Sequence, residues 1–209
     1  MPRAGLGPAA VTAAGAAVAD EVGVGQLSMG LLADRLGVKA PSLYKHVNSL
    51  ADLTHRISVL AMTELGDALR DATQGRAGHD ALTAAAQAWR TFVTKHPGRY
   101  AAANNARATG TDDPLIPAGA RLLASLTAVL RGYQLDPAQQ IHALRMLRST
   151  LHGFTTLEVT GGFQYDTDIE DSFTWMVTLL DHGLTSARGV DHAPHSRTAR
   201  TETHARGRT

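Results

Sequence analysis

The sequence contains no cysteine among its 209 residues, and this absence excludes several kinds of site. Disulfide bonds, thiolate nucleophiles and zinc sites with cysteine ligands all require that side chain. No segment approaches the roughly 20 consecutive apolar residues of a membrane-spanning helix. The Ala-rich run after Arg3 could imitate a signal peptide, but it continues directly into an amphipathic helical pattern. We therefore expect a cytoplasmic protein with no membrane partner.

Catalytic motifs are missing as well. The sequence has no phosphate-binding glycine loop, no G-x-S-x-G, no H-E-x-x-H and no paired carboxylates in an apolar setting. Asp112 and Asp113 lie in a polar loop, where we expect their ionised forms to be solvated. His192 and His195 could bind a metal only weakly, because no third ligand accompanies them. The sequence thus predicts no catalytic residue, no cofactor and no metal site.

Apolar residues recur with the period of an α-helix along most of the chain, and no segment shows the alternation of a strand. This pattern predicts an all-α fold with helices at 11–22, 29–36, 41–47, 50–69, 81–95, 97–107, 117–130, 137–154 and 173–184. Ser28, Ser49 and Asp136 are placed to cap three helices, and Gly37 and Gly132 to end two. From about residue 189 the chain has almost no large apolar side chain, which predicts a disordered tail.

Residues 32–47, "LADRLGVKAPSLYKHV", have the features of a helix-turn-helix. Ala33 is small enough for a second helix to cross closely, and Gly37 follows at the corner. The side chains that anchor both helices on a third are apolar: Leu32, Leu36, Val38, Leu43 and Val47. The outward side chains left on the second helix are donors and one flat ring, suited to phosphates and base edges. They are Lys39, Ala40, Ser42, Tyr44, Lys45 and His46.

Positive charge is concentrated in the same region. The net charge of the chain is only +1, so binding to nucleic acid has to depend on a local excess of cations. Within residues 35–56, Arg35, Lys39, Lys45 and Arg56 are opposed only by Asp52. The stretch is therefore expected to be locally basic. Adjacent helix residues point about 100° apart, so Tyr44 and Lys45 should not contact the same wall of a groove.

The stretch "LSMGLLADRLGVKAPSLYKHV" followed by "NSLADL" resembles the DNA-binding domain of the TetR family of transcriptional regulators, over about residues 8–60. The resemblance implies that Ala40, Ser42, Lys45 and His46 touch bases or backbone and that Tyr44 binds phosphate. Leu50 departs from the family, because many members carry a lysine there that grips phosphate. Contact with phosphate at this position therefore depends more on Ser49 and on the amides at the start of the helix. The full set expected to contact DNA is Ser28, Lys39, Ala40, Ser42, Tyr44, Lys45, His46 and Ser49. For His46 the alternative is a solvated surface histidine.

The stretch "LRSTLHGFTTLEVTGGF", residues 147–163, resembles the WHG-type C-terminal domain of the same family, with Leu151 in place of the tryptophan. The resemblance implies an all-helical domain that binds an effector and dimerises. We therefore expect a DNA-binding domain at 1–50, an effector-binding and dimerisation domain at 51–188, and the tail at 189–209. Apolar stripes on the last two helices would suit a four-helix dimer bundle, and the alternative is that they close one chain's own core. The residues concerned are Leu144, Leu151, Phe154, Phe173, Met176, Val177 and Leu180.

An effector pocket is expected to have aromatic walls and a few polar groups. The candidates are Trp89, Phe92, Tyr100, Asn104, His152 and Trp175. The alternative is a plain core position for the aromatic residues and His152, and a helix end for Asn104. The expected function is a repressor that binds a palindromic operator as a homodimer and is released by a small hydrophobic or aromatic effector. The fourth helix, taken as the one connection between the domains, would transmit the effector signal. The alternatives are a helical adaptor that binds protein or an enzyme without a recognisable motif.

Overall fold

The computed structural model describes residues 6–187, and every regular element in that range is helical. The expected tail and the His192/His195 pair lie outside the described residues. The main helices are α1 (Pro8–Val22), α2 (Met29–Leu36), α3 (Ala40–Leu43), α4 (Leu50–Thr73), α5 (Gly78–Lys95), α6 (Pro97–Asn105), α7 (Leu115–Leu130), α8 (Pro137–Val159) and α9 (Ile169–Ser186). Two short 3-10 turns, η1 (Val24–Gln26) and η2 (Arg131–Tyr133), complete the set. The all-α expectation is confirmed.

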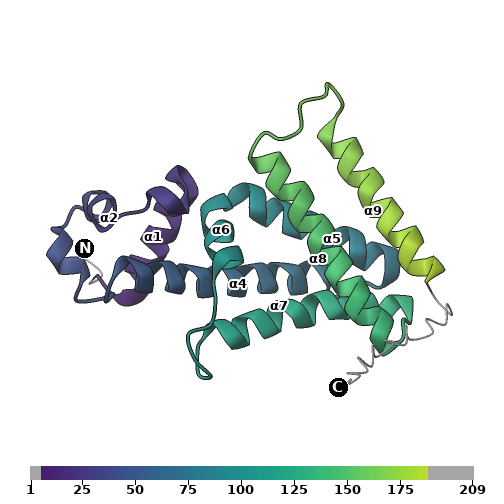
Figure 1. Ribbon diagram of the computed structural model, residues 1–209, viewed down its shortest axis with the longest axis horizontal. Helices are drawn as coiled ribbons and strands as arrows, with labels where there is room; N and C mark the ends of the chain where they lie inside the picture. Colours follow the sequence, from purple (N-terminus) through teal and green to yellow (C-terminus); the bar gives the residue numbers. More distant parts are fainter. Residues whose placement is uncertain (1–5, 188–209) are drawn as a thin grey trace, which may run out of the picture.

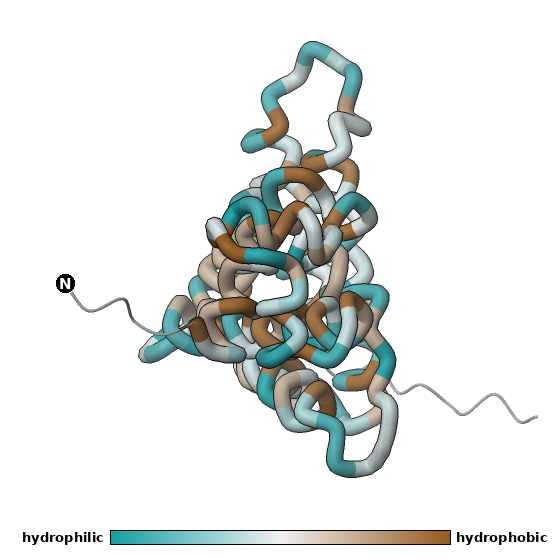
Figure 2. The backbone as a smooth tube through the Cα atoms, turned by 90° about the vertical axis from the view of Figure 1, so that its left-hand side faces the viewer, coloured by the Kyte–Doolittle hydropathy of each residue, from teal (hydrophilic) through white to brown (hydrophobic). Residues whose placement is uncertain are grey.

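The helices form a small unit and a larger one. Figure 1 shows α1 and α2 at one end of the molecule, with α4 running from them into a body that contains α5 to α9. We call α1 to α3 the head and α5 to α9 the body. In Figure 2 hydrophobic and hydrophilic residues alternate along the same helices, as expected of helices that bury one face. The loop between α8 and α9 protrudes from the body in both views.

Local capping explains where several helices begin. The Ser28 hydroxyl accepts a hydrogen bond from the Leu31 amide at 3.2 Å, at the start of α2. Asp136 and Gln139 form a reciprocal capping box before α8, with N···O distances of 2.8 and 3.1 Å. Gly37 ends α2 in the left-handed conformation, with φ of 65°. These three expectations from the sequence are confirmed.

Other boundaries differ from the expectation. α4 continues to Thr73 and α5 already begins at Gly78, which leaves residues 74–77 between them. α9 begins at Ile169 because the Asp168 side chain caps it by accepting a hydrogen bond from the Glu170 amide. Gly132 does not end a helix through a left-handed conformation; Gln134 adopts it instead, with φ of 53°. Position 132 has no room for a side chain, because a Cβ there would lie 2.5 Å from the Gly78 nitrogen.

Two clusters of buried side chains divide α4 between them. The head cluster contains Leu53 and Ile57 of α4 together with Ala102 of α6, and the body cluster contains Ala61, Leu65 and Leu69 of α4. The core of the head therefore extends past residue 50, into α4 and across to α6.

The stretch Leu115–Tyr133 corrects one expectation. By length and composition it could span a membrane, and it is the one such helix within residues 6–187. In the structure α7 packs along α4, with Leu126, Val129 and Leu130 in the body cluster. The approach is close, since a Cβ at Gly66 would lie 3.3 Å from the Leu122 nitrogen. One side of α7 thus serves a helix–helix contact, while Ile116 and Leu123 on the same helix remain exposed.

Candidate DNA-reading surface and effector cavity

The reading helix is a single turn held by its apolar side. The regular helix covers Ala40–Leu43, and amides of His46 and Val47 then donate to the Leu43 carbonyl at 2.9 and 3.1 Å. Leu43 and Val47 are fully buried in the head cluster and fix the orientation of the turn. This anchoring leaves the opposite side of the turn for a partner.

Most of the expected reading residues lie on that outer side, whereas Ala40 packs against the head cluster. Lys39, Tyr44 and Lys45 are exposed, with Tyr44 at 53% of its full surface, and Ala40, Ser42 and His46 are partly buried. One short element thus presents the phenol of Tyr44, the hydroxyl of Ser42 and the ammonium groups of the two lysines. Their chemistry suits phosphate oxygens and the acceptor edges of bases.

The charge of this surface is smaller than the sequence suggested. Arg35 forms an ion pair with Glu21 of α1, and Arg56 pairs with Asp52 at 2.9 Å. Lys39 and Lys45 form no ion pair with any described residue. The free cations therefore lie on the reading helix itself. Glu21 was missed because it lies 14 residues before Arg35, and only the packing of α1 on α2 brings them together.

Ser28 and Ser49 act as helix caps. The Ser49 hydroxyl accepts from the Asp52 amide at 3.0 Å, while the Asp52 carboxylate accepts from the Asn48 amide at 2.8 Å. Each serine oxygen is thus used inside the protein, but the hydroxyl hydrogen remains able to donate to a phosphate. Leu50 is partly exposed at the first position of α4, where it offers no charge.

A second connection joins the head to the body. The amide and Nε of Arg99 donate to the Asp20 carboxylate at 2.9 and 2.7 Å, and the same guanidinium donates to Glu64 of α4 at 2.8 Å. His96 lies 3.1 Å from Asp20. Gly98 permits this closeness, because a Cβ there would lie 1.8 Å from the Ala19 carbonyl oxygen. The expectation that α4 alone joins the two units is therefore wrong.

Asp113 also departs from expectation. Its side chain is buried and accepts from the amides of Thr109 and Leu115 at 2.7 and 2.8 Å, and it lies 2.9 Å from His55 of α4. These hydrogen bonds hold the pKa of the Asp113 carboxyl well below its usual range. The sequence predicted that both Asp112 and Asp113 are solvated, and only Asp112 is exposed. The position of Asp113, just before the start of α7, is the sequence signal that could have revealed this role.

Three of the expected effector residues meet inside the body. The Tyr100 hydroxyl of α6 lies 2.7 Å from His152 Nδ1 of α8, and the Trp89 ring of α5 packs edge-on against Tyr100 with centroids 5.9 Å apart. Burial raises the pKa of the Tyr100 hydroxyl, which therefore stays neutral. Trp89 Nε1 is buried and has no hydrogen-bond partner among the described residues.

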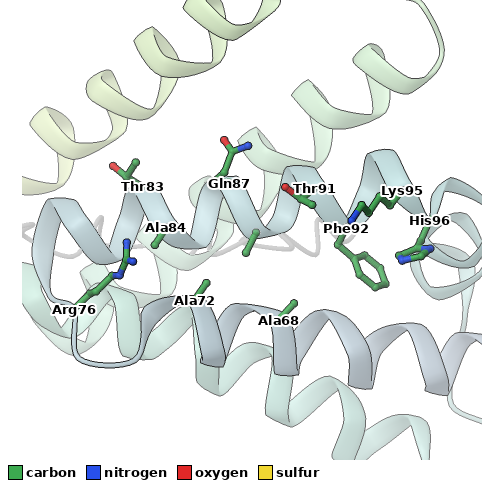
Figure 3. A pocket seen from close by; sticks show the side chains of 11 residues that line it. Ala68, Ala72, Arg76, Thr83, Ala84, Gln87, Thr91, Phe92, Lys95 and His96 are labelled. Carbon is green, nitrogen blue, oxygen red and sulfur yellow. The ribbon is translucent and has the colours of Figure 1, made fainter.

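A cavity of about 380 Å³ opens beside this group. It is lined by Gly23 and Val24 of the head, by α6 between Pro97 and Asn105, by α8 between His152 and Thr160, and by Val93. Of the expected effector residues, Tyr100, Asn104 and His152 line it. Phe92 instead lines a separate groove of about 580 Å³ between α4 and α5, where Ala68 and Ala72 face it from α4 (Figure 3). Trp175 lies on the outer side of α9, 67% exposed, and lines neither hollow.

The residues expected at a dimer interface lie mostly within one chain. Leu151, Phe173, Val177 and Leu180 are buried in the body cluster. Leu144, Phe154 and Met176 are partly buried and pack against it. Four of the seven residues are thus core residues of one chain, as in the alternative, and the other three keep part of their surface exposed. The large apolar side chains that α8 and α9 expose are Ile141, Met146, Leu157, Val159, Trp175 and Leu179.

A helical head that exposes a one-turn reading helix, joined at two places to a larger helical body, defines a helix-turn-helix transcriptional regulator. Residues 82–180 match the family model described as "Tetracyclin repressor-like, C-terminal domain". A Mycobacterium tuberculosis protein, an uncharacterized HTH-type transcriptional regulator, is 39% identical over 166 residues, which are 79% of this chain and 75% of the relative. The HTH-type transcriptional regulator YobS of Bacillus subtilis is 33% identical over 88% of this chain and 95% of its own.

Solved structures share the fold at lower identity. A TetR variant from Acinetobacter baumannii in complex with minocycline has a TM-score of 0.66 at 21% identity, covering 88% of this chain and 99% of its own. BioQ with its double-stranded DNA operator has a TM-score of 0.62 at 20% identity, covering 87% and 99%. The chain belongs to the TetR family of helix-turn-helix transcriptional regulators. It is a regulator of transcription and not an enzyme.

Proposed function

We propose that this regulator is a cytoplasmic homodimeric repressor that binds a palindromic operator and leaves it when a small hydrophobic or aromatic molecule binds the body. The observation that carries the DNA-binding part is the reading helix. It exposes Tyr44 and the two unpaired lysines, Lys39 and Lys45, while Leu43 and Val47 anchor it in the head. Structures of this fold have been determined with an operator, for BioQ, and with minocycline, for a TetR variant.

Dimerisation is supported by the outer sides of α8 and α9. Trp175 and Leu179 are one helical turn apart and both exposed, which is unusual for large apolar side chains in a single chain. A two-fold dimer would place two reading helices about 34 Å apart, one turn of the double helix. This spacing matches a palindrome with half-sites in successive major grooves.

The test is binding of the purified protein to a labelled fragment taken from upstream of its own coding sequence. We expect tighter binding to this fragment than to a scrambled one of equal length. Lys45→Ala should weaken binding by about 1–3 kcal/mol if the lysine contacts a base. The matched control is Lys95→Ala, which removes an exposed lysine from α5 of the body and should leave the affinity unchanged.

Equal binding to the upstream and scrambled fragments, and to fragments from neighbouring genes, would contradict the proposal. A helical adaptor that binds only protein would give that result. Loss of affinity in the Lys95→Ala variant as large as in Lys45→Ala would show that the reading surface had been misplaced.

A further inference from the structure

The head and the first two turns of α4 carry no formal net charge. Residues 6–57 contain as many acidic as basic side chains when histidine is counted as neutral. The basic ones are Arg35, Lys39, Lys45 and Arg56, and the acidic ones are Asp20, Glu21, Asp34 and Asp52. Cations that neutralise phosphates supply most of the affinity of a protein for DNA of any sequence. A DNA-binding unit without a surplus of cations therefore depends on which of its charges are paired with each other.

We infer that Glu21 and Asp52 limit the attraction of this protein to DNA of any sequence, because each holds one arginine near the reading helix in an ion pair. The inference rests on the DNA binding proposed above and adds two residues that regulate its strength. Both carboxylates act through their arginines and need not touch DNA themselves. The lysines of the reading helix, which pair with no described residue, remain as the cations that neutralise phosphates.

The first pair joins the last turns of α1 and α2, which pack against each other. Both terminal nitrogens of Arg35 donate to the Glu21 carboxylate, with Nη1 2.8 Å from Oε1. These hydrogen bonds lower the pKa of the Glu21 carboxyl, so it is ionised at neutral pH. Arg35 stands four residues before Lys39, a separation of at most about 14 Å of extended chain. Once released, its long side chain can reach phosphates beside the reading helix.

The second pair borders the reading turn directly. Nε and Nη2 of Arg56 donate to the Asp52 carboxylate at 2.9 and 3.1 Å, and the carboxylate also accepts from the Asn48 amide at 2.8 Å. The hydrogen bond from Arg56 lowers the pKa of the Asp52 carboxyl. Asn48 follows Val47, the last anchored residue of the turn. The carboxylate thus takes up, at the start of α4, donors that a DNA phosphate could otherwise use.

Exposure distinguishes the Glu21 pair from an ion pair that mainly stabilises the fold. The side chains of Arg35 and Glu21 are 46% and 52% exposed, and exposed pairs contribute little to folding. The Asp20–Arg99 pair, in contrast, is largely buried and joins the head to the body. Asp52 is less exposed and also caps α4, so the Glu21 pair offers the cleaner test.

The experiment measures the affinity of the full-length protein for the upstream and scrambled DNA fragments over a series of salt concentrations. Glu21→Gln removes one charge at constant size and releases Arg35. We expect about tenfold tighter binding to both fragments at about 0.1 M salt, because phosphate contacts carry no sequence information. The slope of log affinity against log salt should steepen by about two for the dimer, one for each released arginine.

Asp34→Asn is the matched control for net charge. Asp34 is exposed, lies next to Arg35 on α2 and forms no ion pair within residues 6–187. The substitution therefore removes the same charge from the head without releasing an arginine, and the salt slope should change little. The double variant Glu21→Gln/Arg35→Gln should return both the affinity and the slope to the native values, since the released cation is then absent.

Asp52→Asn tests the second pair and keeps the test decisive if Glu21→Gln does not fold. The asparagine retains an oxygen for the Asn48 amide, and we expect the salt slope to steepen as in Glu21→Gln. An unchanged slope in both variants would overturn the inference, and so would an equal change in Asp34→Asn, because net charge alone would then explain it. Equal affinity of the native protein for both fragments would instead remove the proposed operator, while the slopes on scrambled DNA would still decide the roles of Glu21 and Asp52.

Discussion

Arg99 of α6 and Asp20 of α1 are joined by two hydrogen bonds, from the backbone amide at 2.9 Å and from Nε at 2.7 Å. Both side chains are largely buried, so water screens the pair only weakly. This pair fixes the C-terminal end of the first head helix to the start of a body helix. Movement of the body can therefore reach the head by a route other than α4.

Removal of the Asp20 charge should loosen this connection. Asp20→Asn leaves the Arg99 guanidinium with Glu64 as its remaining partner, and we expect a loss of unfolding free energy of about 2 kcal/mol. Asp67→Asn is the matched control, because its pair with Arg70 is exposed, screened by water and expected to contribute far less to stability. Urea denaturation of both variants measures the difference. Equal stability of the two variants would argue against a structural role for the Arg99–Asp20 pair.

Tyr44 and Lys45 should affect DNA binding differently, since neighbouring residues of the turn that follows α3 point in different directions. Tyr44→Phe removes one hydroxyl and should weaken binding to upstream and scrambled DNA alike, by about 1 kcal/mol. Lys45→Ala should weaken binding to the upstream fragment more than to scrambled DNA. Titrations of both DNAs over a series of salt concentrations measure these effects.

The same salt series can also show that the roles assigned to Tyr44 and Lys45 are wrong. If Lys45→Ala weakens both DNAs equally and lowers the salt slope by about one, the lysine neutralises a phosphate. The two roles would then be reversed, with base reading left to other residues of the turn.

Trp175 provides the test of the dimer. Trp175→Asp places a charge on the outer side of α9, and we expect a folded monomer, because the ring makes little contact within its own chain. Sedimentation velocity and circular dichroism together measure the mass and the fold. Tyr165→Asp is the control, since that residue is 93% exposed in the protruding loop and should leave the dimer intact. A dimer that persists in Trp175→Asp would show that other surfaces associate.

Phe173, which was expected at the dimer interface from the sequence, is not suitable for that test. Phe173 is buried in the body cluster and packs against Phe154 and the Arg90 guanidinium. An acidic substitution there would unfold the chain and could not report on association.

Asp113 should make stability depend on pH in the acid range. Its folded-state pKa lies below that of the unfolded chain, so its contribution is complete above the ordinary carboxyl pKa, about 4, and is lost as pH falls below that value. Asp113→Asn should therefore be less stable than the native protein at pH 7, and the difference should shrink at pH 3. Denaturant unfolding at the two pH values measures this, with the exposed Asp112→Asn as control. A difference that stays constant with pH would exclude the carboxylate as its source.

The parts of the fold that depend on local chemistry could be predicted from the sequence. Caps at Ser28 and Asp136 and the turn at Gly37 satisfy backbone groups within four residues, so the pattern alone locates them. The helix-turn-helix is likewise local, and the residues predicted to point outward do so except Ala40, which packs against the head cluster.

Contacts between distant segments could not be predicted in the same way. Nothing near Arg35 in the sequence points to Glu21, and nothing near Arg99 points to Asp20. The apolar stripe through Phe173 and Val177 has the same period whether it faces its own core or a second chain. Only the packing of whole helices decides between these possibilities, and it placed the stripe inside one chain.

The sharing of buried residues between the two units has a consequence for exchanging parts among relatives. A chimera cut at residue 50 would replace α1 to α3 but keep Leu53, Ile57 and Ala102, which belong to the core of the original head. It would also keep Gly98 and Arg99, shaped to fit one particular α1. A new operator preference is therefore better transplanted by changing the outward residues of the reading turn than by grafting a complete foreign head.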